Sequence, residues 1–260
     1  MTIIYSKSNF VAHIKLNRPE VINAYNTQMR DELYEALSAV KDDEEIRVLI
    51  ISGNGDKGFC AGADLTEFGS TPSQIIARSV KYERDIWTLM NEIKQPIIAA
   101  LHGYVIGSGL EIACFSDIRI AANDTIFKMP ELSLSLIPAA GGTQTLSRIL
   151  NYSQSLNIIL SNKSISATKA KDIGLVKTIV QKKNLTLVQP STNKKLTFSM
   201  NQFANSFLNN LETVDGFILK AKSPSCGIKD AKYYFKQDKE QSAGKGPGLF
   251  TKKVIKVFPG

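Results

Sequence analysis

The sequence has few cysteines and no long apolar run, and these two absences set its class. Its 260 residues include three cysteines, Cys60, Cys114 and Cys226, which are widely spaced and odd in number. Such a set does not suit a disulfide framework and is typical of a reducing compartment. No stretch approaches the roughly 18 apolar residues of a membrane span, and the start MTIIYSKSNF lacks the regions of a signal peptide. We therefore expect a cytoplasmic globular protein with no membrane partner.

Acidic residues are scarce only toward the C-terminus. Residues 183–260 hold 13 basic and 5 acidic residues, whereas residues 1–182 hold 19 of each. The formal net charge of +8 therefore lies entirely in the tail, which marks two regions that meet at residue 182. A lysine-rich surface is more often solvated than bound to nucleic acid, so a nucleic-acid partner is not expected.

The common nucleotide-binding motifs are also missing. GYVIGSG, which begins at Gly103, lacks the third glycine and the later ribose-binding acid of a dinucleotide fingerprint. Neither it nor GKGPG, which begins at Gly244, has the GK[ST] ending of a phosphate-binding loop. The sequence therefore gives no sign of a nucleotide cofactor bound by either motif.

Strand and helix patterns alternate along residues 1–181. Strand-like alternation predicts a hairpin over 2–15, and Met29, Leu33, Leu37 and Val40 form one helical stripe. Short apolar runs predict buried strands at 47–53 and 96–103, a strand and turn at 117–124, and a closing strand at 176–180. Further helices are predicted over 72–94, from about 143, over 151–160 and over 167–172. This alternation indicates an α/β core without internal sequence repeats.

Two glutamates stand in apolar, glycine-rich surroundings. Glu111 follows GSG at the start of an apolar helix, and Glu131 follows a proline and precedes LIPAAGGTQ. Loss of solvation raises the pKa of a glutamate and suits it to proton transfer near neutral pH. Amides at the GSG turn can stabilise a developing oxyanion. Spacing alone is equally compatible with a helix-terminal acid and a solvated loop.

The order of several motifs makes the chemistry more specific. LNRPEVINAYN, GFCAGADLTEF, HGYVIGSGLEIACFSDIRIA, FKMPELSLSLIPAAGGTQ and LSNKSISATKAKDIGLVKTIV follow one another over residues 1–182. This series resembles the crotonase, or enoyl-CoA hydratase/isomerase, family, with Tyr25 where the family usually has leucine. The resemblance implies a crotonase-like ββα superhelix and a homotrimer or hexamer. Its usual helical C-terminal region is not recognisable here.

The resemblance also implies a reaction and a site. The reaction is reversible addition of water to a 2-enoyl-CoA, in which Glu131 is the acid/base and Glu111 holds the water. The amides of Ala63 and Ser108, the latter replacing a common glycine, would form the oxyanion hole. Coenzyme A belongs to the acyl-CoA substrate, so neither a separate cofactor nor a metal is expected. The remaining residues implied to bind substrate are Cys60, Ala61, Gly62, Asp64, Leu65, Gly107, Pro138 and Gly141.

Two other activities stay open. A double-bond isomerase, or another lyase of this fold, would use the same site to give a different product. A protein of another class, a catalytically impaired fusion with a binding or structural role, would follow if the core no longer trimerises or closes its pocket. The remaining prominent side chains, His13, His102, Cys60 and Trp87, are interpreted as structural or packing residues.

The tail, residues 183–260, has a different resemblance. VDGFILK is predicted to be a buried strand, and SPSCG a loop that exposes Cys226. This part resembles the C-terminal half of the thiouracil desulfurase-like family, where the cysteine of SPSCG is one of three ligands of an iron–sulfur cluster. The other two ligands lie in a half that this chain lacks, and Cys60 and Cys114 belong to crotonase motifs. We therefore expect an atypical α+β appendage without a complete cluster.

Overall fold

The chain divides into two compact units, Met1–Lys182 and Lys183–Gly260. The computed structural model describes residues 1–69 and 73–182, residues 202 and 206, and four short strands. These strands form two antiparallel pairs, β11 (Val188–Gln189) with β12 (Lys194–Lys195) and β13 (Ala231–Tyr234) with β14 (Ser242–Gly246). The predicted strand VDGFILK and the SPSCG loop with Cys226 lie outside the described residues.

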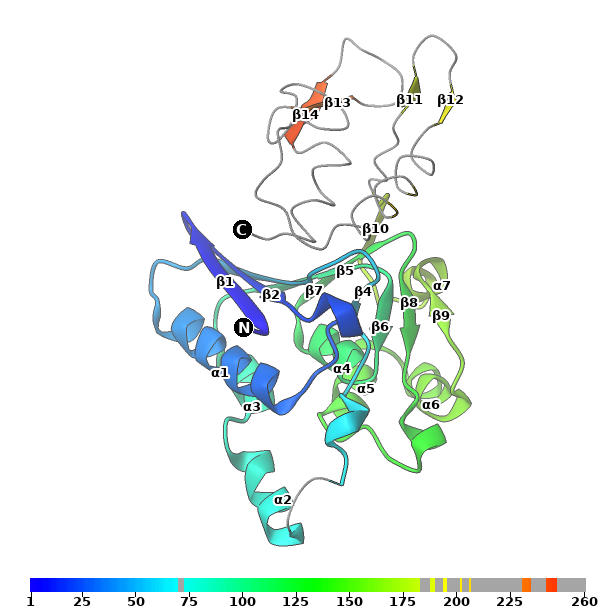
Figure 1. Ribbon diagram of the computed structural model, residues 1–260. Helices are drawn as coiled ribbons and strands as arrows, with labels where there is room; N and C mark the ends of the chain where they lie inside the picture. Colours follow the sequence, from blue (N-terminus) through cyan, green and yellow to red (C-terminus); the bar gives the residue numbers. More distant parts are fainter. Residues whose placement is uncertain are drawn as a thin grey trace. The chain divides into compact units, whose positions relative to one another are not determined.

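Two sheets form the framework of the first unit (Figure 1). The larger sheet has the order β1-β2-β3-β5-β7-β10, and the smaller has the order β4-β6-β8-β9. Successive strands from β3 to β8 therefore enter the two sheets alternately. The strands of the larger sheet are β1 (Ile3–Ser8), β2 (Val11–Leu16), β3 (Val48–Gly53), β5 (Ile97–Leu101), β7 (Ile118–Ala122) and β10 (Thr178–Val180). Those of the smaller are β4 (Gly58–Cys60), β6 (Tyr104–Ile106), β8 (Ile126–Lys128) and β9 (Ile165–Ser166).

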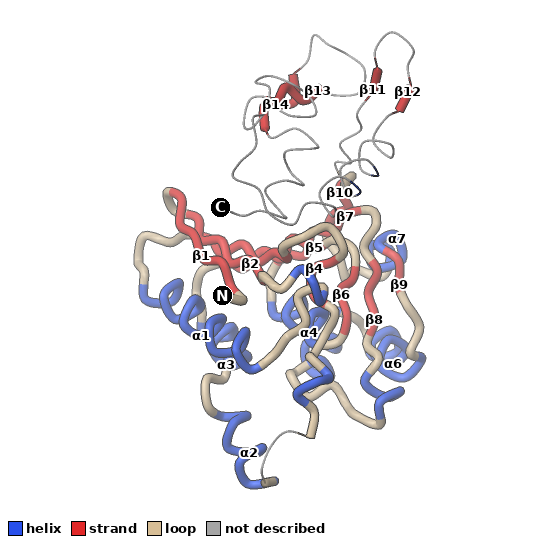
Figure 2. The backbone as a smooth tube through the Cα atoms, in the orientation of Figure 1, coloured by secondary structure: helices blue, strands red, loops and turns tan. Residues whose placement is uncertain are grey.

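Pairing in the larger sheet changes from antiparallel to parallel after the first hairpin. β1 and β2 are antiparallel, as the sequence predicts, and every later neighbour in the sheet is parallel. Parallel strands need crossover connections, and the helices supply most of them (Figure 2). The mixed α/β class predicted from the sequence is confirmed.

Helices pack against these sheets. Helix α1 begins where Asn26 accepts a 2.9 Å hydrogen bond from the Met29 amide, and it buries the predicted stripe. Helix α4 is almost wholly buried, as its apolar sequence predicts. The helices of the first unit are α1 (Thr27–Asp42), α2 (Gln74–Tyr82), α3 (Ile86–Glu92), α4 (Ser108–Phe115), α5 (Gly142–Ile149), α6 (Tyr152–Ser161) and α7 (Ala167–Asp172). Short 3₁₀ turns are η1 (Pro19–Val21), η2 (Leu65–Glu67) and η3 (Glu131–Leu134).

The single helix predicted over 72–94 is wrong, because the structure has two helices there. The first ends at Tyr82 with Glu83 as an extended C-cap, and Arg84, which follows, adopts a left-handed conformation with φ of 51°. Asp85 then caps the second, since its Oδ1 accepts from the Trp87 and Thr88 amides at 3.0 and 3.1 Å. The break lets α3 follow a different direction from α2, which projects away from the sheets (Figure 1).

The core of the first unit fills the space between the sheets and the helices. Its largest fully buried side chains include Phe59, Phe127, Leu33 and Ile51, from strands of both sheets and from α1. Within the part of the chain that the structure describes, no helix is both long and apolar enough to cross a bilayer.

Candidate active site

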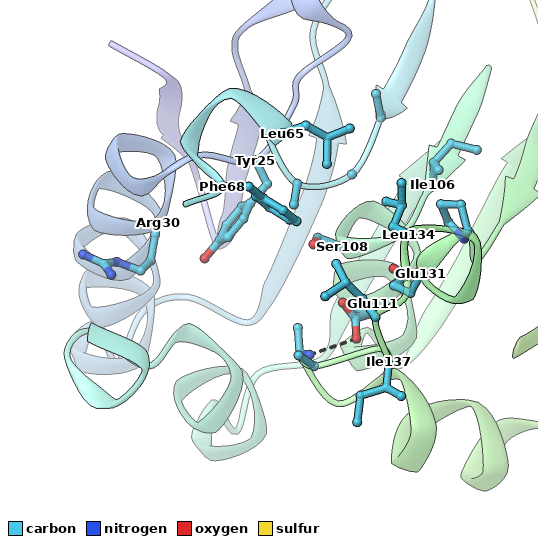
Figure 3. A pocket seen from close by; sticks show the side chains of 18 of the residues that line it. Tyr25, Arg30, Leu65, Phe68, Ile106, Ser108, Glu111, Glu131, Leu134 and Ile137 are labelled. Carbon is cyan, nitrogen blue, oxygen red and sulfur yellow. Dashed lines mark hydrogen bonds between the residues drawn. The ribbon is translucent and has the colours of Figure 1, made fainter. Parts of the chain in front are cut away.

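A cavity of about 420 Å³ lies between the loops that follow β4 and β6 and the segment from Pro130 to Ala140. Both predicted glutamates line it, as Figure 3 shows. Its other lining residues are Tyr25, Arg30, Ala61, Gly62, Ala63, Leu65, Phe68, Arg84, Asp85, Trp87, Ile106, Gly107, Ser108, Pro130, Leu134, Leu136, Ile137, Ala139 and Ala140.

Glu111 is a buried carboxylate held by the backbone. It lies in the first turn of α4 and is 2% exposed. Its Oε1 accepts hydrogen bonds from the amides of Ala140 and Gly142, at 3.0 and 2.9 Å. Burial raises the pKa of Glu111 to about 7, and the negative charge of Glu131 acts in the same direction. These two amides hold the carboxyl group in place while its proton affinity is tuned to neutral pH.

Glu131 faces the same cavity and lies beside Glu111 (Figure 3). It begins the turn η3 directly after Pro130 and is half-buried. Its Oε2 is buried and has no hydrogen-bond partner among the described residues. Burial raises the pKa of this carboxyl group as well. A buried acceptor without a partner costs free energy, so this oxygen is suited to contact a bound ligand or water.

Two glycine turns approach each other at the edge of the cavity. Gly62 and Gly107 have φ of 100° and 49°, which side chains rarely adopt. A Cβ on Gly62 would lie 3.2 Å from the Ile106 carbonyl oxygen, and one on Gly107 would lie 2.9 Å from Glu131 Oε1. Glycine at both positions therefore lets the turns come together and brings Ala63 close to Ser108.

The amides of Ala63 and Ser108 are left without protein acceptors in the described part of the chain. The neighbouring amides of Tyr25 and Asp64 are used, because Tyr25 N bonds Gly62 O and Asp64 N bonds Tyr25 O, both at 2.8 Å. Ser108 is the first residue of α4, where an amide has no partner within the helix. Two donors at the rim of one cavity can stabilise negative charge on an oxygen.

Four predicted substrate-binding residues do not line the cavity. Cys60 is fully buried in β4, and a Cβ on Gly109 would lie 2.6 Å from its carbonyl oxygen, so it packs against α4. The Asp64 carboxylate bonds Arg18 at 2.8 Å instead of facing the cavity. Pro138 is buried behind the wall, and Gly141 forms the left-handed turn that starts α5. The lining does include the predicted Ala61, Gly62, Ala63, Leu65, Gly107 and Ser108.

Several lining residues were not predicted. Trp87 was expected in the core, yet its ring both lines the cavity and packs between Tyr25 and Phe115, at centroid distances of 5.9 and 5.6 Å. Arg30 and Arg84 bring positive charge to the lining. Tyr25 did carry a signal in the sequence, because it replaces the leucine usual in the resembling family.

The cysteines and histidines of the first unit do not line the cavity. Burial raises the pKa of both the Cys60 and the Cys114 thiols to about 12, which leaves them protonated. His13 Nε2 is 2.8 Å from Ser52 Oγ, and His102 Nε2 is 3.0 Å from Gly55 O; neither ring lines the cavity. Residues 1–69 and 73–182 contain no group of three histidines, cysteines or carboxylates arranged to hold a metal ion.

Replacing Glu111 by glutamine is expected to change how stability depends on pH. The pKa of Glu111 rises from its ordinary 4.5 to about 7 in the folded protein. The folded state therefore loses stability as pH rises from about 4.5 to about 7, by at most about 3 kcal/mol at 1.36 kcal/mol per pH unit. The neutral glutamine removes this loss and keeps an acceptor for the two amides.

The measurement is urea unfolding of wild type and Glu111→Gln at pH 5 and pH 8. The variant is expected to gain stability relative to wild type between these two pH values. Glu44→Gln, at an exposed position after α1, serves as the control and keeps the wild-type pH dependence. An identical pH dependence in Glu111→Gln and wild type would contradict the raised pKa of the buried carboxyl group.

Comparison with known proteins gives a consistent set of relatives. A sequence model described as enoyl-CoA hydratase/isomerase matches residues 6–250. The chain is 37% identical over 170 residues to a putative enoyl-CoA hydratase/isomerase, YngF, of Bacillus subtilis, an alignment that covers 65% of each protein. It is 37% identical over 184 residues to a crotonyl-CoA hydratase of Syntrophomonas wolfei, which covers 70% of each.

A solved structure has the same fold. The crystal structure of an enoyl-CoA hydratase from Bacillus anthracis superposes with a TM-score of 0.64 at 28% identity and covers 82% of this chain and 85% of that one. The chain thus spans slightly less than two thirds of the length of YngF and slightly more of the Syntrophomonas protein.

Proposed function

The chain belongs to the enoyl-CoA hydratase/isomerase family, and we propose that it adds water reversibly to the double bond of a 2-enoyl-CoA thioester. The observation that carries the proposal is the pair of glutamates with raised pKa that line one cavity beside two unpaired backbone amides. One carboxylate would suffice to move a proton between two carbons. A second one offers a place to hold water.

Binding orients the thioester against the two glycine turns. Its carbonyl oxygen accepts hydrogen bonds from the amides of Ala63 and Ser108, which are fixed in place before the substrate arrives. As water adds, negative charge collects on this oxygen, and the donors stabilise it without reorganising. They therefore favour the enolate more than the neutral thioester, which lowers the barrier.

Water then adds across the double bond. Glu131 takes a proton from the water as its oxygen bonds to C3, and the electrons of the C2–C3 double bond move toward the thioester oxygen. The protonated carboxyl of Glu131 delivers its proton to C2 as the thioester carbonyl re-forms. The product is a 3-hydroxyacyl-CoA, and the enzyme returns to its starting protonation state.

The surroundings of the two carboxyl groups support this division of roles. Two backbone amides fix Oε1 of Glu111, and this leaves its other oxygen to hold the attacking water. Glu131 has a buried oxygen with no partner among the described residues, which suits a group that takes up and releases a proton. Fixed positions for water and acid/base reduce the entropy lost on the way to the transition state.

A labelling experiment separates hydration from isomerisation. Purified protein is incubated with crotonyl-CoA in H₂¹⁸O, and the thioester products are analysed by mass spectrometry. We expect 3-hydroxybutyryl-CoA that carries one ¹⁸O at C3, because the added hydroxyl comes from solvent. A 3-enoyl-CoA formed without ¹⁸O from a longer 2-enoyl-CoA would instead identify a double-bond isomerase.

We propose that the tail, residues 183–260, takes the place of the usual helical ending; the family model matches as far as residue 250. The competing proposal is a fusion protein whose core no longer turns over substrate. It requires a monomer by size-exclusion mass that does not bind acyl-CoA, whereas the hydratase proposal requires binding and expects a trimer or hexamer. Sulfur chemistry at Cys226 would require an iron-containing, brown protein after anaerobic purification.

A further inference from the structure

One end of the cavity is charged although the acyl group of a simple enoyl thioester is a hydrocarbon. Arg30, Arg84, Asp85 and Tyr25 all contribute to the lining. Figure 3 shows Arg30 and Tyr25 on the far side of the cavity from Glu131. The Arg84 side chain is 44% exposed and keeps much of its hydration, and a polar group on the ligand would replace the hydration that it loses when the cavity is filled.

Arg84 is the most unusual of these residues. Its φ of 51° lies in the left-handed region, which costs a side-chain-bearing residue free energy, and this backbone places the side chain at the break between α2 and α3. Its Nη1 is 3.2 Å from Glu35 Oε1 and 3.4 Å from Asp31 O, both long contacts. Neither its Nε nor its Nη2 donates to any atom of the described residues. The guanidinium therefore keeps donors for a ligand.

The neighbouring acids are already engaged elsewhere. Asp85 caps α3 through Oδ1, and its Oδ2 accepts from Thr88 Oγ1 at 2.7 Å. Asp31 Oδ1 binds Arg30 through Nε at 2.8 Å and Nη2 at 2.7 Å. Glu35 contacts Arg84 through one oxygen, and its side chain is 67% exposed. Such exposed ion pairs contribute little to the stability of the fold. Arg84 can thus bind a second anion at small cost.

Tyr25 adds a neutral donor at the same end. Its ring packs on Trp87, and burial raises its pKa, so the hydroxyl stays protonated. Figure 3 shows this hydroxyl pointing toward the side of the cavity on which Arg30 lies. Its hydroxyl makes no hydrogen bond within the described ranges. A phenol hydroxyl and a guanidinium together are suited to an anionic oxygen.

On the premise of the proposed hydration, we propose that the acyl group carries a carboxylate at its far end. Arg84 and the Tyr25 hydroxyl bind this carboxylate, while the thioester at the other end of the acyl group lies between Ala63 and Ser108. The substrate class is then a 2-enedioyl-CoA, such as 2-hexenedioyl-CoA, in preference to 2-hexenoyl-CoA, whose acyl group has the same length and no charge.

Binding of saturated analogues tests the inference without relying on turnover. Isothermal titration of the full chain compares adipyl-CoA with hexanoyl-CoA, which differ only in the terminal carboxylate. We expect adipyl-CoA to bind about tenfold more tightly, as one charge-assisted contact at a partly exposed guanidinium allows. Arg84→Asn is expected to reduce the ratio of the two affinities to near one, and Tyr25→Phe to reduce it in part.

Two features make these variants informative. Asparagine tolerates the left-handed backbone at position 84, so Arg84→Asn removes charge without adding strain. Arg148→Gln removes an arginine from an exposed position of α5 that does not line the cavity, and it should keep the wild-type ratio. If Arg84→Asn abolishes the preference for adipyl-CoA and Arg148→Gln preserves it, the preference is due to the Arg84 guanidinium.

The outcomes separate three possibilities. Equal affinities in wild type, or an Arg84→Asn ratio like that of wild type, would overturn the carboxylate subsite. Arg84→Asn could instead weaken the binding of adipyl-CoA and hexanoyl-CoA equally and leave the binding of adipyl-pantetheine and hexanoyl-pantetheine unchanged. That result would overturn the subsite, because it would show that Arg84 contacts a phosphate of the coenzyme. A preference for adipyl-CoA in a protein that hydrates no enoyl-CoA would uphold the subsite and refute the hydratase.

Discussion

Replacing Glu131 by glutamine is expected to lower kcat for hydration of crotonyl-CoA by roughly 10²- to 10⁴-fold, the usual contribution of a general acid–base. Glutamine keeps the size of the side chain but cannot take a proton from water or deliver one to C2. Glu111→Gln still offers the attacking water a hydrogen-bond acceptor. It is expected to lower kcat by about 10²-fold, because the water is held in a less favourable position. Loss of the absorbance of the conjugated thioester measures both rates.

The two variants are interpreted together with their KM values. A loss in kcat with little change in KM indicates that the carboxyl groups act on the transition state rather than in substrate binding. Glu44→Gln, at an exposed position outside the cavity, should retain wild-type rates. Activity that survives in both Glu111→Gln and Glu131→Gln would refute the assignment of two catalytic carboxylates.

Ser108→Pro is expected to lower kcat/KM for crotonyl-CoA by roughly 10²- to 10³-fold, the cost of one oxyanion-hole donor. Proline removes the backbone N–H, and the first position of a helix is where it is best tolerated. Ser108 occupies that position in α4, so the helix itself loses no hydrogen bond. The substitution therefore tests a backbone group by conventional mutagenesis.

Ser108→Ala is the matched control because it removes the hydroxyl and keeps the amide. It should retain activity within a few-fold, since the proposed contact uses the amide and not the side chain. Circular dichroism and thermal unfolding of both variants confirm that α4 is intact. If Ser108→Pro were as active as Ser108→Ala, this amide would have no role in stabilising the enolate.

Much of the fold could be predicted because its apolar residues follow clear periods. The hairpin of β1 and β2, the helix stripe of Met29 to Val40 and the buried start of α4 appear as the patterns indicate. The break between α2 and α3 escaped prediction because the apolar pattern runs on through Arg84 without glycine or proline. A left-handed arginine followed by a capping aspartate interrupts the helix instead.

The cavity was harder to predict than the elements around it. Motif order pointed to Ala63, Ser108, Glu111 and Glu131, and each of them lines the cavity. Within such a motif some residues line the cavity and others pack in the protein interior, which the motif alone does not reveal. Cys60 is an example, because it lies one residue before Ala61 and faces α4.

Distance along the chain explains the remaining omissions. Arg30 lies on α1 and Arg84 between α2 and α3, far in sequence from the glycine turns. They join the site only because α1 and α3 pack together, a tertiary contact that no local pattern encodes. Local chemistry can be found in a motif, whereas the far wall of a pocket depends on packing.

The strand order of the first unit has a consequence for synthesis of the protein. In the larger sheet the neighbours follow the order in which the ribosome releases them, from β1 to β10, and the smaller sheet runs likewise from β4 to β9. Each new strand can therefore add to an exposed edge that already exists, without inserting between earlier strands. Domains generally fold as units, the N-terminal one first during synthesis, and within this unit no strand has to displace an earlier pairing. Glu111 and Glu131 then become neighbours only when the α4 turn is followed by η3, late in that sequence.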